Sequence, residues 1–200
     1  MTDLDDRGAA TRDLERIRAL MERATRFSNL SGWSCIVAGL LAVAGAVVCW
    51  KIRANFNHAF CARPLALVWG SVLVLALAQG VVFTFVNARR RGEPVWSDLT
   101  RQVVVAMLPS CFVGAVITGH GLLTCQLDLL PPIWMLAYGM SLMALGLFAG
   151  AKIKAVGILF LLLGAAALWW FREYGLRMML VSFGGLHVLL GIVIVWKHRV

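Results

Sequence analysis

The long apolar segments of this 200-residue chain contain no aspartate and no glutamate. The acidic residues are confined to the first 22 positions and to short polar connections, where Glu93, Asp98, Asp128 and Glu173 lie. Proton pumps and many proton-coupled transporters carry carboxylates inside their membrane helices. Such a carboxylate relay is therefore excluded, which counts against a proton-coupled transporter unless a histidine replaces the carboxylate.

Several catalytic motifs are missing as well. The chain has no glycine-rich nucleotide loop, no HExxH, no GxSxG and no CxxC. A membrane hydrolase would need a nucleophile beside a base, and no such set is visible. Four of the five cysteines fall in or beside apolar runs, where cysteine usually packs as a small hydrophobic residue. These absences favour a protein without enzymatic activity.

Charge is scarce and hydrophobic residues are abundant. Hydrophobic residues make up 60% of the chain and charged residues 14%, whereas soluble domains have about 45–50% and about 25%. The net charge of +9 comes from basic residues that flank apolar segments, and no basic stripe interleaved with aromatics occurs. The lipid bilayer, and not a nucleic acid, is therefore the expected partner.

Six apolar segments are long enough to cross a bilayer, which needs about 20 helical residues. They cover residues 30–50, 64–86, 103–123, 133–150, 153–171 and 176–196. The sequence thus predicts an all-α class: a polytopic bundle of six transmembrane helices spanning 29–200. Only Ala151 and Lys152 separate the fourth and fifth segments, which predicts a tight antiparallel hairpin.

A different pattern precedes the first span. After a short acidic tail, residues 11–28 place apolar side chains at helical spacing, with arginines between them. This pattern predicts an amphipathic helix on the membrane surface, with Arg12, Arg16, Arg23 and Arg26 facing lipid phosphates. Residues 1–28 then form a cytoplasmic tail and amphipathic helix. A partner-binding or dimerising helix is the alternative.

The basic residues also predict the orientation of the chain. If the N-terminus is inside the cell, 14 of the 19 lysines and arginines lie on the cytoplasmic side. Because positively charged loops stay in the cytoplasm, both termini are expected there. The tryptophans fall at predicted helix ends or loops, as in the aromatic belts of membrane proteins.

One imidazole lies near the middle of the last span. His187 is ten residues after Arg177 and ten before Lys197, which places it near the centre of a hydrocarbon layer about 30 Å thick. Lipid offers no hydrogen bond at that depth, so the ring must face protein or a cavity. Gln79, Thr118 and His120 are the candidate partners.

His120 lies in the third span, closer to its end. Two imidazoles from different helices are able to form interhelical hydrogen bonds, to line a ligand cavity, or to ligate haem b or a metal. The different depths of His120 and His187 count against a metal or haem. We therefore predict no cofactor and no metal, and take the four residues His187, His120, Gln79 and Thr118 as candidates for lining a ligand cavity.

Small residues recur on several spans and predict close helix packing. Gly146 and Gly150 form a GxxxG motif, and Ala38, Ala42 and Ala46 form a stripe on the first span. Gly184, Gly185 and Gly191 surround His187 in the sequence. These faces are able to join helices within one chain or in a homodimer.

Four parts of the sequence carry a resemblance: residues 15–32, the stretch 88–96, Gly119-His-Gly-Leu, and Glu173-Tyr-Gly-Leu followed by Phe183-Gly-Gly-Leu-His-Val-Leu-Leu-Gly. They resemble an uncharacterised group of small bacterial inner-membrane proteins. The resemblance covers nearly the whole chain. It implies six helices and an amphipathic N-terminal entry in the bacterial plasma membrane, and it supplies no activity. The Ala-rich first span departs from the bulkier residues expected there.

Three functional hypotheses follow. The first is a non-enzymatic role in membrane sensing, regulation or assembly. The second is a transporter or channel for a small solute, with a cavity near His187. The third is a redox protein that binds haem or metal through His120 and His187.

Overall fold

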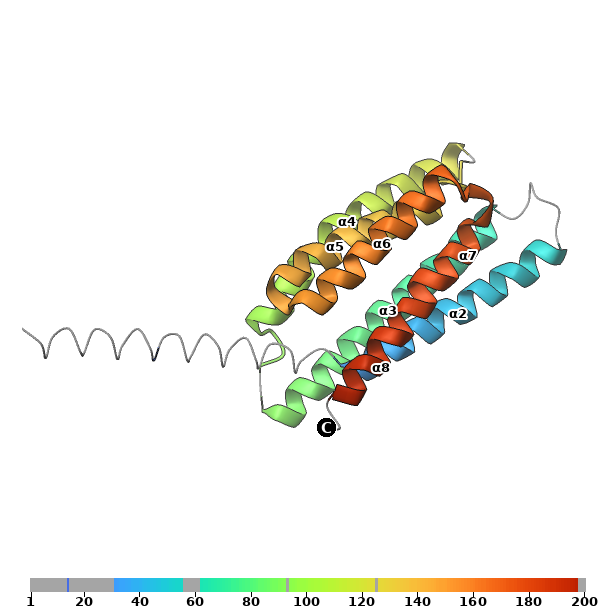
Figure 1. Ribbon diagram of the computed structural model, residues 1–200. Coiled ribbons are helices and arrows are strands. Elements are labelled where there is room, and N and C mark those ends of the chain that lie inside the picture. The colour runs from blue at the N-terminus through green and yellow to red at the C-terminus, as the bar shows by residue number, and fades with distance from the viewer. Residues whose placement is uncertain (1–13, 15–30, 56–61, 93, 125, 198–200) are drawn as a thin grey trace, which may run out of the picture. The chain divides into compact units, whose positions relative to one another are not determined.

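The computed structural model describes Leu14 and residues 31–55, 62–92, 94–124 and 126–197. Residues 1–30 and 31–200 form separate units, and the predicted surface arginines of the first unit lie outside the described residues. The second unit is helical, and its described part contains no strand (Figure 1). Its elements are α2 (Gly32–Asn55), α3 (Ala62–Arg91), α4 (Asp98–Thr124), α5 (Leu130–Ala149), α6 (Ala151–Trp169), η2 (Arg172–Tyr174), α7 (Gly175–Met179), η3 (Leu180–Leu186) and α8 (His187–Lys197).

Six membrane-length helices in the described part confirm the predicted all-α bundle, with α7, η3 and α8 together forming the last one. Some helices are longer than the predicted spans: α3 has 30 residues, or about 45 Å at 1.5 Å per residue. The hydrocarbon layer is about 30 Å thick. Backbone hydrogen bonding therefore continues beyond the apolar run that defines a span.

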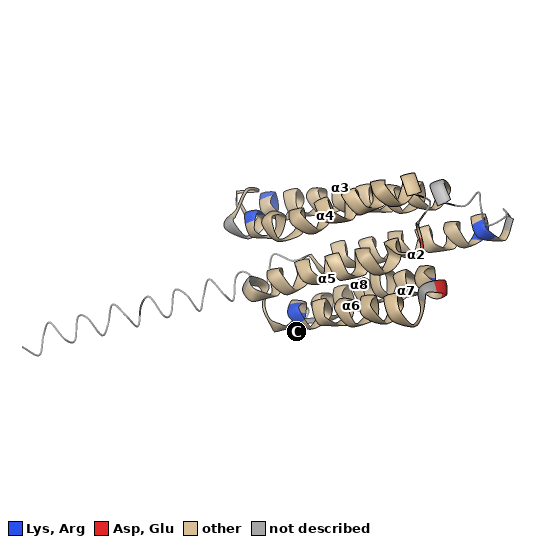
Figure 2. Cartoon of the chain, turned by 90° about the horizontal axis from the view of Figure 1, so that it is seen from above, with Lys and Arg blue, Asp and Glu red and all other residues tan. Residues whose placement is uncertain are grey.

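The helices pack as two stacks of three. In the first stack, α3 packs on α2, and α2 packs on η3 and α8. In the second stack, α4 packs on α5, and α5 packs on α6. Figure 2 shows α3 and α4 together along one side of the bundle. The outer helices α3 and α4 expose most of their side chains, as expected for helices that face lipid.

The second stack depends on glycine. A Cβ added at Gly139 of α5 would lie 3.0 Å from the carbonyl oxygen of Gly157 on α6, and one at Gly157 would lie 2.9 Å from the backbone nitrogen of Met143. A Cβ at Gly146 would meet the backbone of Lys154 at 2.8 Å. The two backbones touch at these positions, so no larger residue fits without moving a helix.

Glycines also allow close backbone contact between the helices of the first stack. A Cβ added at Gly191 would lie 2.6 Å from the carbonyl oxygen of Gly32, and one at Gly39 would lie 2.8 Å from that of Gly184. The predicted small-residue face of the last span thus packs on α2 within the chain. Gly185 differs, because nothing lies within 4 Å of the position of its Cβ.

The turn between α5 and α6 consists of Gly150, with φ 104°. The predicted turn at Ala151 and Lys152 is wrong, because both residues belong to α6. A positive φ is strained for residues with a Cβ. The chain therefore reverses at the glycine, and the helix resumes at the next residue.

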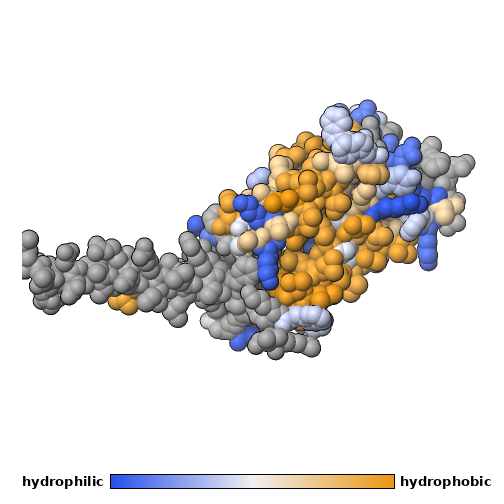
Figure 3. All heavy atoms as spheres, in the orientation of Figure 1, coloured by the Kyte–Doolittle hydropathy of each residue, from blue (hydrophilic) through white to orange (hydrophobic). Residues whose placement is uncertain are grey.

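The surface of the bundle is apolar along its middle. Figure 3 shows orange side chains across the central part of one face and hydrophilic side chains near both ends. Exposed large residues such as Leu67, Val105 and Leu162 are more than 60% accessible. A contiguous apolar surface of this size needs lipid around it.

Candidate functional site

The imidazole of His187 meets a phenol from the other stack. The Nε2 atom of His187, at the start of α8, lies 2.7 Å from the Oη atom of Tyr138 on α5. This distance is that of a good hydrogen bond. His187 is the thirteenth of the 23 residues from Gly175 to Lys197, so the bond lies near the middle of the bundle.

Aromatic rings surround this bond. The ring of Phe160 on α6 lies 4.9 Å from that of Tyr138 and 5.1 Å from that of Phe183 on η3, measured between centroids. The ring of Phe183 stacks on that of His187 at 6.1 Å. Phe160 is completely buried. We call Tyr138, Phe160, Phe183 and His187 the aromatic joint, because two of its rings come from each stack.

The helix that carries His187 is irregular just before it. Residues Leu180–Leu186 form a π-helix, in which each hydrogen bond spans five residues instead of four. The hydroxyl of the buried Ser182 donates to the carbonyl oxygens of Met178 at 2.8 Å and Met179 at 3.4 Å. It thereby satisfies carbonyl groups where the α pattern changes to the π pattern.

The second ring nitrogen of His187, Nδ1, lacks a hydrogen-bond partner among the described residues. Nδ1 is buried and forms no hydrogen bond with any described residue, although backbone groups of Ser182 and Phe183 come close to the ring. Buried polar atoms without a partner are rare in folded proteins. The joint is therefore held by one side-chain hydrogen bond and by ring packing.

The three predicted partners of His187 are engaged elsewhere or exposed. Gln79 bonds Ser34 of α2 through both its amide atoms, at 3.1 and 3.3 Å. Thr118 accepts a hydrogen bond from Trp134 of α5 at 3.0 Å. The side chain of His120 is exposed on α4. Gln79 therefore links α3 to α2 in the first stack, and Thr118 links α4 to α5 in the second.

The structure does not join His120 and His187 in one site. One imidazole is exposed on α4, whereas Nε2 of the other is bonded to Tyr138. Within the described ranges, no group of three His, Cys, Asp or Glu residues is placed to hold a metal ion. The donors present thus suit a hydrogen-bonded contact between helices better than axial ligation of haem.

Tyr138, Phe160 and Phe183 were not predicted as site residues. One signal was available: Tyr138 is the only tyrosine inside a predicted span, since Tyr174 lies between two spans. A phenol at that depth needs a polar partner as much as an imidazole does. No feature of the sequence pointed to Phe160 or Phe183 as site residues, because a phenylalanine is compatible with any position of a membrane helix.

Comparison with protein-family models, with curated protein sequences and with solved structures gives no match to this chain.

Proposed function

We propose that this chain is a multi-pass protein of the bacterial inner membrane with a non-enzymatic sensing, regulatory or assembly role. The observation that carries the proposal is the π-helix Leu180–Leu186 directly before His187, in the contact between the two stacks. Short π segments are rare and occur frequently at functional sites. This one lies where a change in helix geometry alters how the stacks meet.

The physical basis is a change of register. Conversion of a π turn to α geometry moves the following residues by one position, about 100° around the helix axis and 1.5 Å along it. Gly184 and Gly185 lower the cost of altered backbone geometry within the segment. His187 would then leave Tyr138, so the joint would have two discrete arrangements through which it would respond to its surroundings.

The alternatives have weaker support. A small-solute transporter needs polar groups free to contact substrate, whereas the hydroxyls of Ser141, Thr118 and Tyr138 bond to neighbouring helices or side chains. Haem ligation through His187 needs a ring nitrogen aimed into a site large enough for the macrocycle. Nε2 is bonded to Tyr138, and the unbonded Nδ1 is buried on a ring that packs against Phe160 and Phe183.

The inner-membrane location and cytoplasmic termini rest on the basic residues of the loops and on the sequence resemblance. Fusion of a periplasm-active reporter after Arg63 should give signal, and fusion after Val200 should give none. A bright fusion at Val200 would reverse the orientation.

The sensing role is tested by the distance between the stacks. Spin labels at Ile158 of α6 and Val193 of α8, both exposed, would be introduced into a cysteine-free chain. Distances would be measured by pulsed electron resonance in thin and thick bilayers, with and without anionic lipid. A sensing protein should show two distances whose populations change with the bilayer.

Deletion of Gly185 provides the matched control. Removing one residue from a π-helix restores α geometry and keeps both flanks in register, and no atom lies near the Cβ position of Gly185. This variant should fold and show one distance in every bilayer. A single unchanged distance in the parent protein would refute the sensing role.

A further inference from the structure

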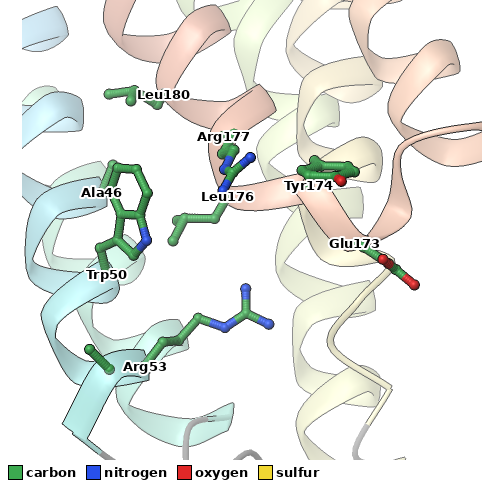
Figure 4. Close-up of a pocket in the computed structure, with 9 residues that line it drawn as sticks. Ala46, Trp50, Arg53, Glu173, Tyr174, Leu176, Arg177 and Leu180 are labelled. Carbon is green, nitrogen blue, oxygen red and sulfur yellow. The ribbon is translucent and has the colours of Figure 1, made fainter.

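A pocket of about 390 Å³ opens at the end of the bundle where α2 ends and α7 begins. Trp50 and Arg53 of α2 line one side, and Tyr174 and Arg177 line the other. Figure 4 shows the side chain of Arg53 extending from α2 toward the residues of α7. Arg177 lies ten residues before His187, and the lining contains no residue of the aromatic joint.

Two guanidinium groups give the pocket its charge. Arg177 lies over the ring of Tyr174 at 5.1 Å and over that of Trp50 at 5.8 Å, which restricts its side chain. Among the described side chains, neither Arg53 nor Arg177 forms an ion pair. Glu173 is the one acidic residue of the lining, and its carboxylate points away from both arginines in Figure 4. The pocket is thus a cationic site with an unmatched positive charge.

The lining changes from charged to apolar along the helices. Arg53 lies near the end of α2 and Glu173 lies in η2, whereas Ala46 and Leu180 lie about two turns farther into the spans. Tryptophan and tyrosine occupy the level between them, as they do at membrane–water interfaces. This order matches an amphiphile with an anionic head and an apolar chain.

We propose that the pocket binds the phosphate group of an anionic phospholipid between Arg53 and Arg177, with an acyl chain along Ala46 and Leu180. Guanidinium groups present several fixed donors to phosphate oxygens and form the stronger, charge-assisted hydrogen bonds. Trp50 and Tyr174 hold Arg177 in place before the lipid arrives, which reduces the entropy lost on binding. The proposal is independent of the proposed sensing role.

The test is native mass spectrometry of the full chain in detergent, with dioleoyl-phosphatidylglycerol as the probe. Dioleoylglycerol has the same chains without the phosphate and should not bind at the same concentration. Arg53→Gln and Arg177→Gln should each weaken phosphatidylglycerol binding about tenfold or more, because each removes charge-assisted hydrogen bonds. Arg53→Lys should bind more tightly than Arg53→Gln but less tightly than the parent, since lysine keeps the charge but lacks the planar set of donors that a guanidinium group presents to phosphate oxygens.

Lys51→Gln is the matched control, because Lys51 is exposed on α2 and does not line the pocket. It should bind phosphatidylglycerol as the parent does. An equal loss with Lys51→Gln, or equal binding of dioleoylglycerol, would overturn the proposal. If Arg177→Gln fails to fold, Arg53→Gln still decides the outcome. Inorganic phosphate has no acyl chain. If it displaces phosphatidylglycerol at millimolar concentration, the lipid assignment is overturned in favour of free phosphate.

Discussion

Replacement of Tyr138 by phenylalanine should lower the free energy of unfolding by about 1–2 kcal/mol. The ring and its contacts with Phe160 and Phe183 remain, so the change removes only the hydroxyl that bonds His187. Hydrogen bonds between membrane helices contribute about 0.6 kcal/mol on average and up to about 2 kcal/mol. The upper part of this range applies, because Nδ1 already lacks a partner among the described residues and the whole imidazole would then be unpaired.

A double-mutant cycle isolates the bond itself. His187→Leu should also cost about 1–2 kcal/mol, because it leaves the Tyr138 hydroxyl buried without a partner. His187→Gln should keep part of the stability, since an amide still bonds a phenol. The double variant Tyr138→Phe with His187→Leu leaves no orphan polar group. It should therefore be more stable than the sum of the two losses predicts, by about 1 kcal/mol.

The assay is reversible unfolding in mixed micelles at increasing dodecyl sulfate, followed by tryptophan fluorescence. Tyr174→Phe is the matched control, because Tyr174 is the second of the two tyrosines and is exposed at the end of the bundle. Its loss of stability should stay within about 0.5 kcal/mol. Strictly additive losses at Tyr138 and His187, or a Tyr138→Phe protein as stable as the parent, would refute an energetic role for the bond.

Three further predictions concern helix packing and use the same assay. Gly157→Val should cost about 2–3 kcal/mol or prevent folding, because its Cβ would lie 2.9 Å from a backbone nitrogen of α5; a neutral effect would contradict the close approach of α5 and α6. Gly150→Ala should cost about 1–3 kcal/mol, since φ is 104°, and an unchanged stability would place the turn elsewhere. Gln79→Leu should cost about 1 kcal/mol by removing its bonds to Ser34. A Gln79→Leu protein with full stability would show that these bonds are not formed.

The sequence by itself determined the class, the number of membrane-length helices and the position of His187 near the middle of the last one. Each follows from the length of apolar runs, and a bilayer requires about 20 such residues for every crossing helix. The fourth and fifth segments had to form a hairpin because so few residues separate them. The turn was misplaced by one or two residues, since hydropathy does not reveal which glycine takes a positive φ.

The tertiary structure alone decided which side chains meet. Helices such as α3 and α6 are apolar on every side, so no amphipathic stripe marks the face that packs inward. Gln79, Thr118, His120 and Tyr138 were all polar groups at membrane depth, and the sequence did not rank Tyr138 among the partners. The π-helix was equally hidden, because no residue type or spacing in Leu180–Leu186 distinguishes a π turn from an α turn. Contacts between helices depend on rotation about their axes, and that rotation is set by the small residues and rings that fit against each other.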